Sequence, residues 1–195
     1  MRIPFFKSPA AALAGVALLV AAGTAYADPE GPFLGADIGV SWAEGLPSSY
    51  STDAGLRFSI TPGYRIYSDD TFEVSLQLDT GMLWNSFHQQ AGFARANGDM
   101  YQVPILGGFE YAFHASKFVV PYIGIEGGGV YNDIEYNNGG SQGNFVGAIG
   151  ADAGVKFRFN DHFDLGVGYK FLATFGPLSS TICNHTALVN FVFHF

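Results

Sequence analysis

Apolar and polar side chains alternate, one residue at a time, along the C-terminal part of this chain. In residues 145–159 every odd position is apolar or glycine, and the even positions include Asp152 and Arg158. Residues 163–175 repeat the pattern, with Lys170 on the second parity. A period of two places alternate side chains on opposite faces of a β-strand. Each of these strands therefore has one face without charge, and that face must lie against an apolar interior or against lipid.

The same alternation predicts eight strands. They cover residues 33–43, 54–66, 71–85, 101–113, 118–132, 145–159, 163–175 and 185–195. Short turns are expected near 67–70, 114–117 and 160–162, and longer loops near 44–53, 86–100, 133–144 and 176–184. Short turns on one rim and longer loops on the other are typical of bacterial outer-membrane barrels, with the short rim periplasmic. The pattern predicts an all-β fold, an eight-stranded antiparallel up-and-down transmembrane β-barrel with both termini at the periplasmic rim.

The aromatic residues indicate which face of this barrel is outside. On the apolar parity, an outer belt lies near the longer loops (Trp42, Trp84, Tyr101, Tyr131 and Phe175) and a periplasmic belt lies near the short turns (Tyr64, Phe72, Tyr111, Phe113, Phe157, Phe163 and Phe195). A bilayer selects two such belts around an aliphatic band, because amphipathic rings prefer the interfaces. A soluble ligand-binding barrel would instead turn its apolar parity inward. The belts favour lipid as the partner of the apolar face.

The charged parity is then expected to face the lumen, because a lysine or arginine turned to lipid at mid-depth costs about 2–4 kcal/mol. An eight-stranded barrel is only wide enough for side chains to fill its lumen. We predict an ion-pair and hydrogen-bond network there rather than an open pore. Its acidic members are Glu73, Glu110, Glu126 and Asp152, and its basic members are Arg57, Arg65, Lys156, Arg158 and Lys170. The pairings depend on the strand register, and a gated ion or proton path stays open as an alternative.

Residues 1–27 have the three-part layout of a cleavable secretory signal. A basic N-terminus is followed by an apolar stretch over residues 10–22 and by small residues up to Ala27. The apolar stretch is too short for a membrane-spanning helix, which needs roughly 20 residues. We expect cleavage between Ala27 and Asp28, so that residues 28–195 form one outer-membrane β-barrel domain.

The composition argues against several other functions. Once Arg2 and Lys7 leave with the signal, 7 Lys and Arg residues face 17 Asp and Glu residues, a net charge of −10. Such acidity argues against nucleic-acid binding, which needs a basic face. The five histidines lack metal-ligand spacing, no glycine-rich phosphate loop precedes a helical pattern, and the single Cys183 cannot form an intramolecular disulfide. We predict no cofactor and no metal site.

The chain ends in Phe191-Val192-Phe193-His194-Phe195, with aromatic residues at the final, third-from-last and fifth-from-last positions. This resembles the signal that the outer-membrane assembly machinery reads, although Asn190 replaces the usual glycine and Leu188 the usual polar residue. Residues 28–195 as a whole resemble the OmpA- and OmpX-type superfamily of small barrels, the outer membrane protein β-barrel domain proteins, most clearly from Pro121 to Phe171. The resemblance implies the cell outer membrane of a Gram-negative bacterium as the location.

Members of this superfamily include membrane anchors, adhesins, immune-evasion proteins and a few enzymes, so that the resemblance does not select a function. Our first hypothesis is a non-enzymatic, monomeric barrel that contributes to envelope structure and presents loops at the cell surface, with adhesion as a further role. Its partners would be outer-membrane lipids and lipopolysaccharide, and the barrel assembly machinery during insertion.

Two alternatives stay open. A lipid A or phospholipid acyl hydrolase would need a serine held by a histidine and an acidic partner. The local candidates are His185 with Ser179 or Ser180, and His88 with Ser86. The second alternative is a small ion-conducting pore, which would need an open lumen.

Overall fold

The computed structural model of the chain describes residues 30–45, 50–89, 97–137, 140–175 and 181–195. These residues form nine β-strands: β1 Pro32–Glu44, β2 Tyr50–Thr52, β3 Gly55–Ser68, β4 Phe72–Gln89, β5 Asn97–Phe113, β6 Val119–Tyr136, β7 Ser141–Asn160, β8 Phe163–Phe175 and β9 Thr181–His194. No helix of the described residues has the length and apolar character needed to cross a membrane.

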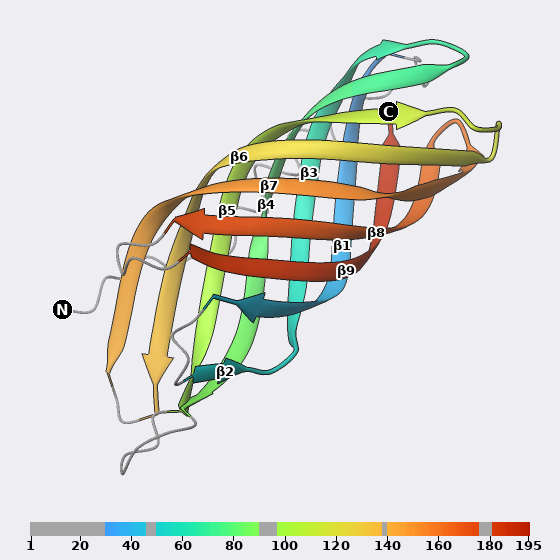
Figure 1. Ribbon diagram of the computed structural model, residues 1–195. Helices are drawn as coiled ribbons and strands as arrows, with labels where there is room; N and C mark the ends of the chain where they lie inside the picture. Colours follow the sequence, from blue (N-terminus) through green and yellow to red (C-terminus); the bar gives the residue numbers. More distant parts are fainter. Residues whose placement is uncertain (1–29, 46–49, 90–96, 138–139, 176–180) are drawn as a thin grey trace.

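Eight of the strands close into an antiparallel barrel (Figure 1). From β3 to β9 each strand pairs with the next one along the chain, and β1 pairs with both β3 and β9. The sheet is thereby closed on itself, as a spanning sheet must be to satisfy its backbone in lipid. The short strand β2, within the connection predicted over residues 44–53, pairs with the end of β4. The predicted eight-stranded barrel is confirmed.

Alternate residues along each strand face opposite sides of the barrel wall. Ile125, on the apolar parity, is 65% exposed, whereas Asp79, on the charged parity, is completely buried. A bulge between Arg65 and Tyr67 shifts the register at the periplasmic end of β3. The apolar parity therefore faces lipid and the charged parity faces the lumen.

Strands β4 to β7 extend further than predicted. They contain 18, 17, 18 and 20 residues, and β6 and β7 run beyond the ends of β8 and β9 (Figure 1). The longer loops predicted over 86–100 and 133–144 are therefore wrong in their extent. Polar residues suggested loops there, but Phe87, Met100 and Ile134 pack together on the inner side and hold these strands in register.

Local hydrogen bonds hold the short turns at the periplasmic rim. Asp69 Oδ1 accepts hydrogen bonds from the backbone amides of Phe72 at 2.9 Å and Thr71 at 2.7 Å. These bonds stabilise the ionised carboxylate, so they lower the pKa of Asp69 below its ordinary value. In the next turn, Ser116 Oγ accepts a hydrogen bond from the Val119 amide at 2.9 Å.

Candidate functional site

A buried ion cluster surrounds Asp79 in the barrel lumen. Arg57 Nη2 donates to Asp79 Oδ2 at 2.6 Å, and Lys170 Nζ contacts the same oxygen. Lys170 Nζ also lies 2.8 Å from Glu126 Oε2. The side chains of Arg57 and Asp79 are completely buried. Each of the four side chains comes from a different strand (β3, β4, β6 and β8), so that this cluster joins the barrel wall across its interior.

A second ion cluster surrounds Glu73 at the periplasmic end of the lumen. Arg65 Nε lies 3.2 Å and Arg158 Nη2 lies 3.1 Å from Glu73 Oε2. Arg158 Nε also lies 3.2 Å from Asp164 Oδ1, and His194 Nε2 lies 3.0 Å from Asp164 Oδ2. These five side chains fill the end of the lumen next to the short turns.

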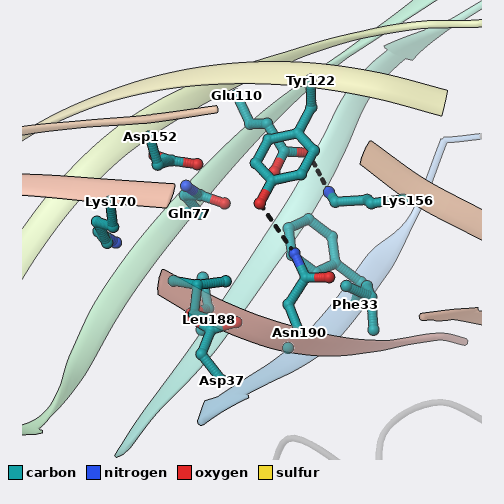
Figure 2. A pocket seen from close by; sticks show the side chains of 13 residues that line it. Phe33, Asp37, Gln77, Glu110, Tyr122, Asp152, Lys156, Lys170, Leu188 and Asn190 are labelled. Atoms are coloured by element: carbon teal, nitrogen blue, oxygen red, sulfur yellow. Dashed lines mark hydrogen bonds and ion pairs between the residues drawn. The ribbon is translucent and has the colours of Figure 1, made fainter. Parts of the chain in front are cut away.

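A small cavity lies beside these clusters (Figure 2). Among its lining residues, Lys156 Nζ pairs with Glu110 and lies 4.7 Å from the centre of the Tyr122 ring. Asn190 donates a hydrogen bond to the Tyr122 hydroxyl at 3.2 Å. Asp152 lines the cavity, and its Oδ1 has no hydrogen-bond partner among the described residues. The cavity volume of about 30 Å³ is enough for about two water molecules and too small for a channel.

The structure brings together eight of the nine residues predicted for the lumen network, and only Asp152 forms no ion pair with a described side chain. We did not predict Asp79 and Asp164 as acidic members, although the alternation placed both on the charged parity. In the β3–β4 pairing Arg57 lies opposite Leu83, four residues from Asp79, so the long arginine side chain reaches Asp79 along the lumen. Lys170 meets Asp79 from the opposite side of the barrel.

Part of the lumen is apolar, which we did not predict. Leu106, Val130, Val146, Ala148 and Leu172 pack into one buried cluster contributed by β5, β6, β7 and β8. All five lie on the parity that carries the lumen charges, so the sequence contained this signal. An ion in contact with these side chains would lose part of its hydration.

Glycines on the inner face leave room for the neighbouring strand. A Cβ atom at Gly108 would lie 2.5 Å from the backbone oxygen of Ile125, whereas at Gly107, on the lipid side of β5, it would meet nothing within 4 Å. We expect Gly108→Ala to lower the free energy of unfolding by about 1–3 kcal/mol, because backbone cannot move aside as a side chain can. Gly107→Ala should change it by less than about 0.5 kcal/mol. Equilibrium unfolding in urea, with the barrel folded in lipid vesicles, measures both; equal effects would contradict the argument.

His88 and Ser86, one of the candidate catalytic pairs, contact different carboxylates. His88 Nδ1 lies 3.2 Å from Asp53 Oδ2, and both side chains are exposed. Ser86 donates its hydroxyl hydrogen to Asp99 Oδ1 at 2.8 Å rather than to the histidine. Among the described residues, no group of three or more His, Cys, Asp and Glu side chains is arranged to hold a metal ion.

The other candidate catalytic histidine, His185, lies on the outer parity of β9. Its Nδ1 is hydrogen-bonded to the hydroxyl of Tyr169, and its Nε2 lies 3.8 Å from Glu44 Oε2. Ser179 and Ser180, which we considered as its partners, lie outside the described residues. The hydrogen-bond partner of this imidazole is thus a phenol, which the sequence pattern had not indicated.

The predicted assembly signal lies at the end of β9. Phe191 and Phe193 face outward, and the backbone amide of Phe195 donates to the carbonyl oxygen of Pro32 at 3.1 Å. The last residue is therefore tied to the first strand, next to the seam that closes the barrel. The predicted cleavage position between Ala27 and Asp28 lies outside the described residues.

A family model described as the outer membrane protein beta-barrel domain matches residues 9–195. The chain belongs to this family. The resemblance inferred from the sequence is confirmed, and the protein is located in the outer membrane of a Gram-negative bacterium. No curated protein sequence matches the chain.

Solved outer-membrane barrels share its fold. Neisserial surface protein A (NspA) superposes with a TM-score of 0.61 at 17% identity, over 84% of this chain and 97% of that chain. Ail of Yersinia pestis, solved with the heparin analogue sucrose octasulfate, has a TM-score of 0.55 at 12% identity, over 85% and 99%. OprG of Pseudomonas aeruginosa has a TM-score of 0.53 at 14% identity, over 85% and 96%. At such identities the likeness shows the fold of this outer membrane protein beta-barrel and not its activity.

Proposed function

We propose that this barrel is a non-enzymatic structural component of the outer membrane that also presents a surface outside the cell. The observation that supports this role is the filled lumen. Arg57, Asp79, Leu106 and Leu172 are each at most 1% exposed. The Asp79–Lys170 ion pair joins strands on opposite sides of the barrel. A closed barrel with ion pairs across its lumen stiffens the surrounding membrane and does not let solutes through.

The contacts of the two histidines do not favour an acyl hydrolase. Neither the His88 nor the His185 imidazole is hydrogen-bonded to a serine in the described part of the chain. His185 is instead hydrogen-bonded to the Tyr169 hydroxyl, and a phenol is a poor nucleophile toward a lipid ester. A phenoxide leaves more easily than the alkoxide that it would have to expel, so the tetrahedral intermediate would revert to the ester.

The surface beyond the outer belt is acidic. Asp99, Asp133 and Glu135 lie on the outer parity of the extended strands, and Asp99 lies directly opposite Glu135 in the β5–β6 pairing. No lysine or arginine occurs in the described residues of this region. Ail was solved with a sulfated heparin analogue, and a polyanion of that kind does not complement carboxylates. An adhesive role of this barrel would therefore require a cationic partner.

Cells that lack this chain are expected to take up more of a hydrophobic dye through the outer membrane than cells that carry it. The physical reason is that a missing structural barrel leaves lipopolysaccharide less well packed. Fluorescence of the dye in whole cells measures the uptake, and expression of the wild-type chain should restore the lower value. Equal uptake with and without the chain would contradict the structural role.

Two assays on the purified barrel separate this role from its alternatives. In planar bilayers, we expect no steady openings; reproducible conductance altered by Glu126→Ala would show a pore instead. On incubation with lipopolysaccharide or phospholipid, we expect no release of fatty acid. Release that is lost in His185→Ala would show a hydrolase. Either result would replace the structural role with the corresponding activity.

A further inference from the structure

His185 is an ionisable side chain that faces lipid. Between the two aromatic belts, the described strands turn no other histidine, carboxylate or basic side chain toward lipid. The next outward residues of β9, Ala187 and Val189, are exposed. In the β1–β9 pairing His185 lies directly opposite Trp42, a member of the outer belt. Such belts mark the headgroup level of a bilayer. An ionisable side chain facing lipid is costly and points to a function.

Aromatic side chains hold the imidazole in one orientation. The Trp42 ring stacks on it, with centroids 5.8 Å apart and planes inclined by 11°. Phe171 lies 5.4 Å away at an angle of 59°, and the Tyr169 hydroxyl is hydrogen-bonded to Nδ1. The side chain of His185 is only 19% exposed. Nε2 is the ring nitrogen that these contacts leave for another partner.

Nε2 of His185 and the carboxylate of Glu44 face each other without a direct hydrogen bond. Their separation of 3.8 Å exceeds the hydrogen-bonding distance. When the Tyr169 hydroxyl donates to Nδ1, the ring hydrogen lies on Nε2, which is then a donor. Glu44, whose side chain is 68% exposed, is an acceptor for a cation at the level of the headgroups. Donor and acceptor together fit a ligand that carries an anionic oxygen and an ammonium group.

We propose that this site binds the phosphoethanolamine headgroup of an outer-membrane lipid. A phosphate oxygen accepts the hydrogen bond of His185 Nε2, and the ammonium group donates to Glu44. Trp42 forms the wall against which the adjoining acyl chain lies. This inference deepens the proposed structural role, because it gives the barrel a specific lipid partner. Its test does not depend on cell permeability, so the two proposals can fail separately.

Trp42 itself can report the bound lipid. The chain has two tryptophans, so Trp84→Phe leaves Trp42 as the only one. We would reconstitute this variant in phosphatidylcholine vesicles that contain a minor fraction of lipid with brominated acyl chains, which quench tryptophan on contact. Brominated phosphatidylethanolamine should quench Trp42 with an association constant about tenfold above that of brominated phosphatidylcholine, equivalent to about 1.4 kcal/mol.

His185→Phe, which keeps the aromatic packing, and Glu44→Gln, on an exposed side chain, should each abolish this preference. His88→Phe, at a histidine beyond the belt, should leave it unchanged. Relief of quenching by lipopolysaccharide that carries phosphoethanolamine would assign the headgroup to that lipid, and relief by unlabelled phosphatidylethanolamine alone would assign it to a phospholipid. Equal quenching by all headgroups, or equal quenching by phosphatidylglycerol and phosphatidylethanolamine, would overturn the proposal.

Discussion

Replacing Asp79 with alanine is expected to lower the free energy of unfolding by about 3–5 kcal/mol, because loss of one partner leaves a buried charge uncompensated. Asp79 accepts a hydrogen bond from Arg57 at 2.6 Å and contacts Lys170, and the side chains of Asp79 and Arg57 are completely buried. In the variant Lys170 keeps Glu126 at 2.8 Å. Arg57 keeps no carboxylate within 4.0 Å among the described residues, so most of the loss should arise from its unpaired guanidinium.

Unfolding by guanidinium chloride of the barrel folded in lipid vesicles, followed by tryptophan fluorescence, measures this loss. Asp53→Ala is the matched control, because Asp53 belongs to an exposed pair with His88 and should contribute at most about 1 kcal/mol. The double variant Arg57→Met/Asp79→Leu should recover much of the stability, since apolar side chains often replace a buried ion pair without loss. If Asp79→Ala behaved like Asp53→Ala, the cluster would not brace the barrel.

Ile125→Arg is expected to lower the free energy of unfolding in a bilayer by about 2–4 kcal/mol, because it places a charge in hydrocarbon near mid-depth. Ile125 is 65% exposed on the lipid side of β6. It is paired with Phe109 and Ala151 of the adjacent strands, so that apolar or small residues flank it on both sides. No neighbouring carboxylate on that face can compensate the guanidinium within the described strands.

Tyr131→Arg, on the same face of the same strand, is the control. Tyr131 belongs to the outer belt, and an arginine near the interface costs about 0–1 kcal/mol. Both variants would be unfolded from vesicles of the same lipid composition. A ranking with Tyr131→Arg as the more damaging change would mean that the belts do not mark the membrane boundaries.

The alternation predicted both ends of β8 and the turn between β7 and β8 to within one residue, whereas β7 begins at Ser141, four residues before the predicted start. Alternation is a local property, since each side chain only has to match the medium on its own side of the wall. The same reasoning failed past the outer belt. A loop was predicted there over residues 133–144, yet β6 continues to Tyr136. Water lies outside the wall at that height, so polar residues on the outer parity no longer distinguish a loop from a strand.

The lumen shows the same limit. Its charged members were predictable from parity, but the roles of Asp79 and Asp164 as ion-pair partners were not. Lys170 reaches Asp79 from a strand on the opposite side of the barrel, 91 residues further along the chain. His185 was singled out from the sequence as a partner for serine, whereas the fold places it between Tyr169, Trp42 and Glu44.

By itself the sequence determined the number of barrel strands, the face that meets lipid and the compartment. These follow from the period of two, the aromatic belts and the export and C-terminal patterns, which are all readable along one strand or one segment. Only the tertiary structure decided which charges pair, which apolar lumen residues meet and what surrounds His185. Those contacts join residues that are distant in the sequence, and a shift of one residue in the strand register would rearrange every one of them.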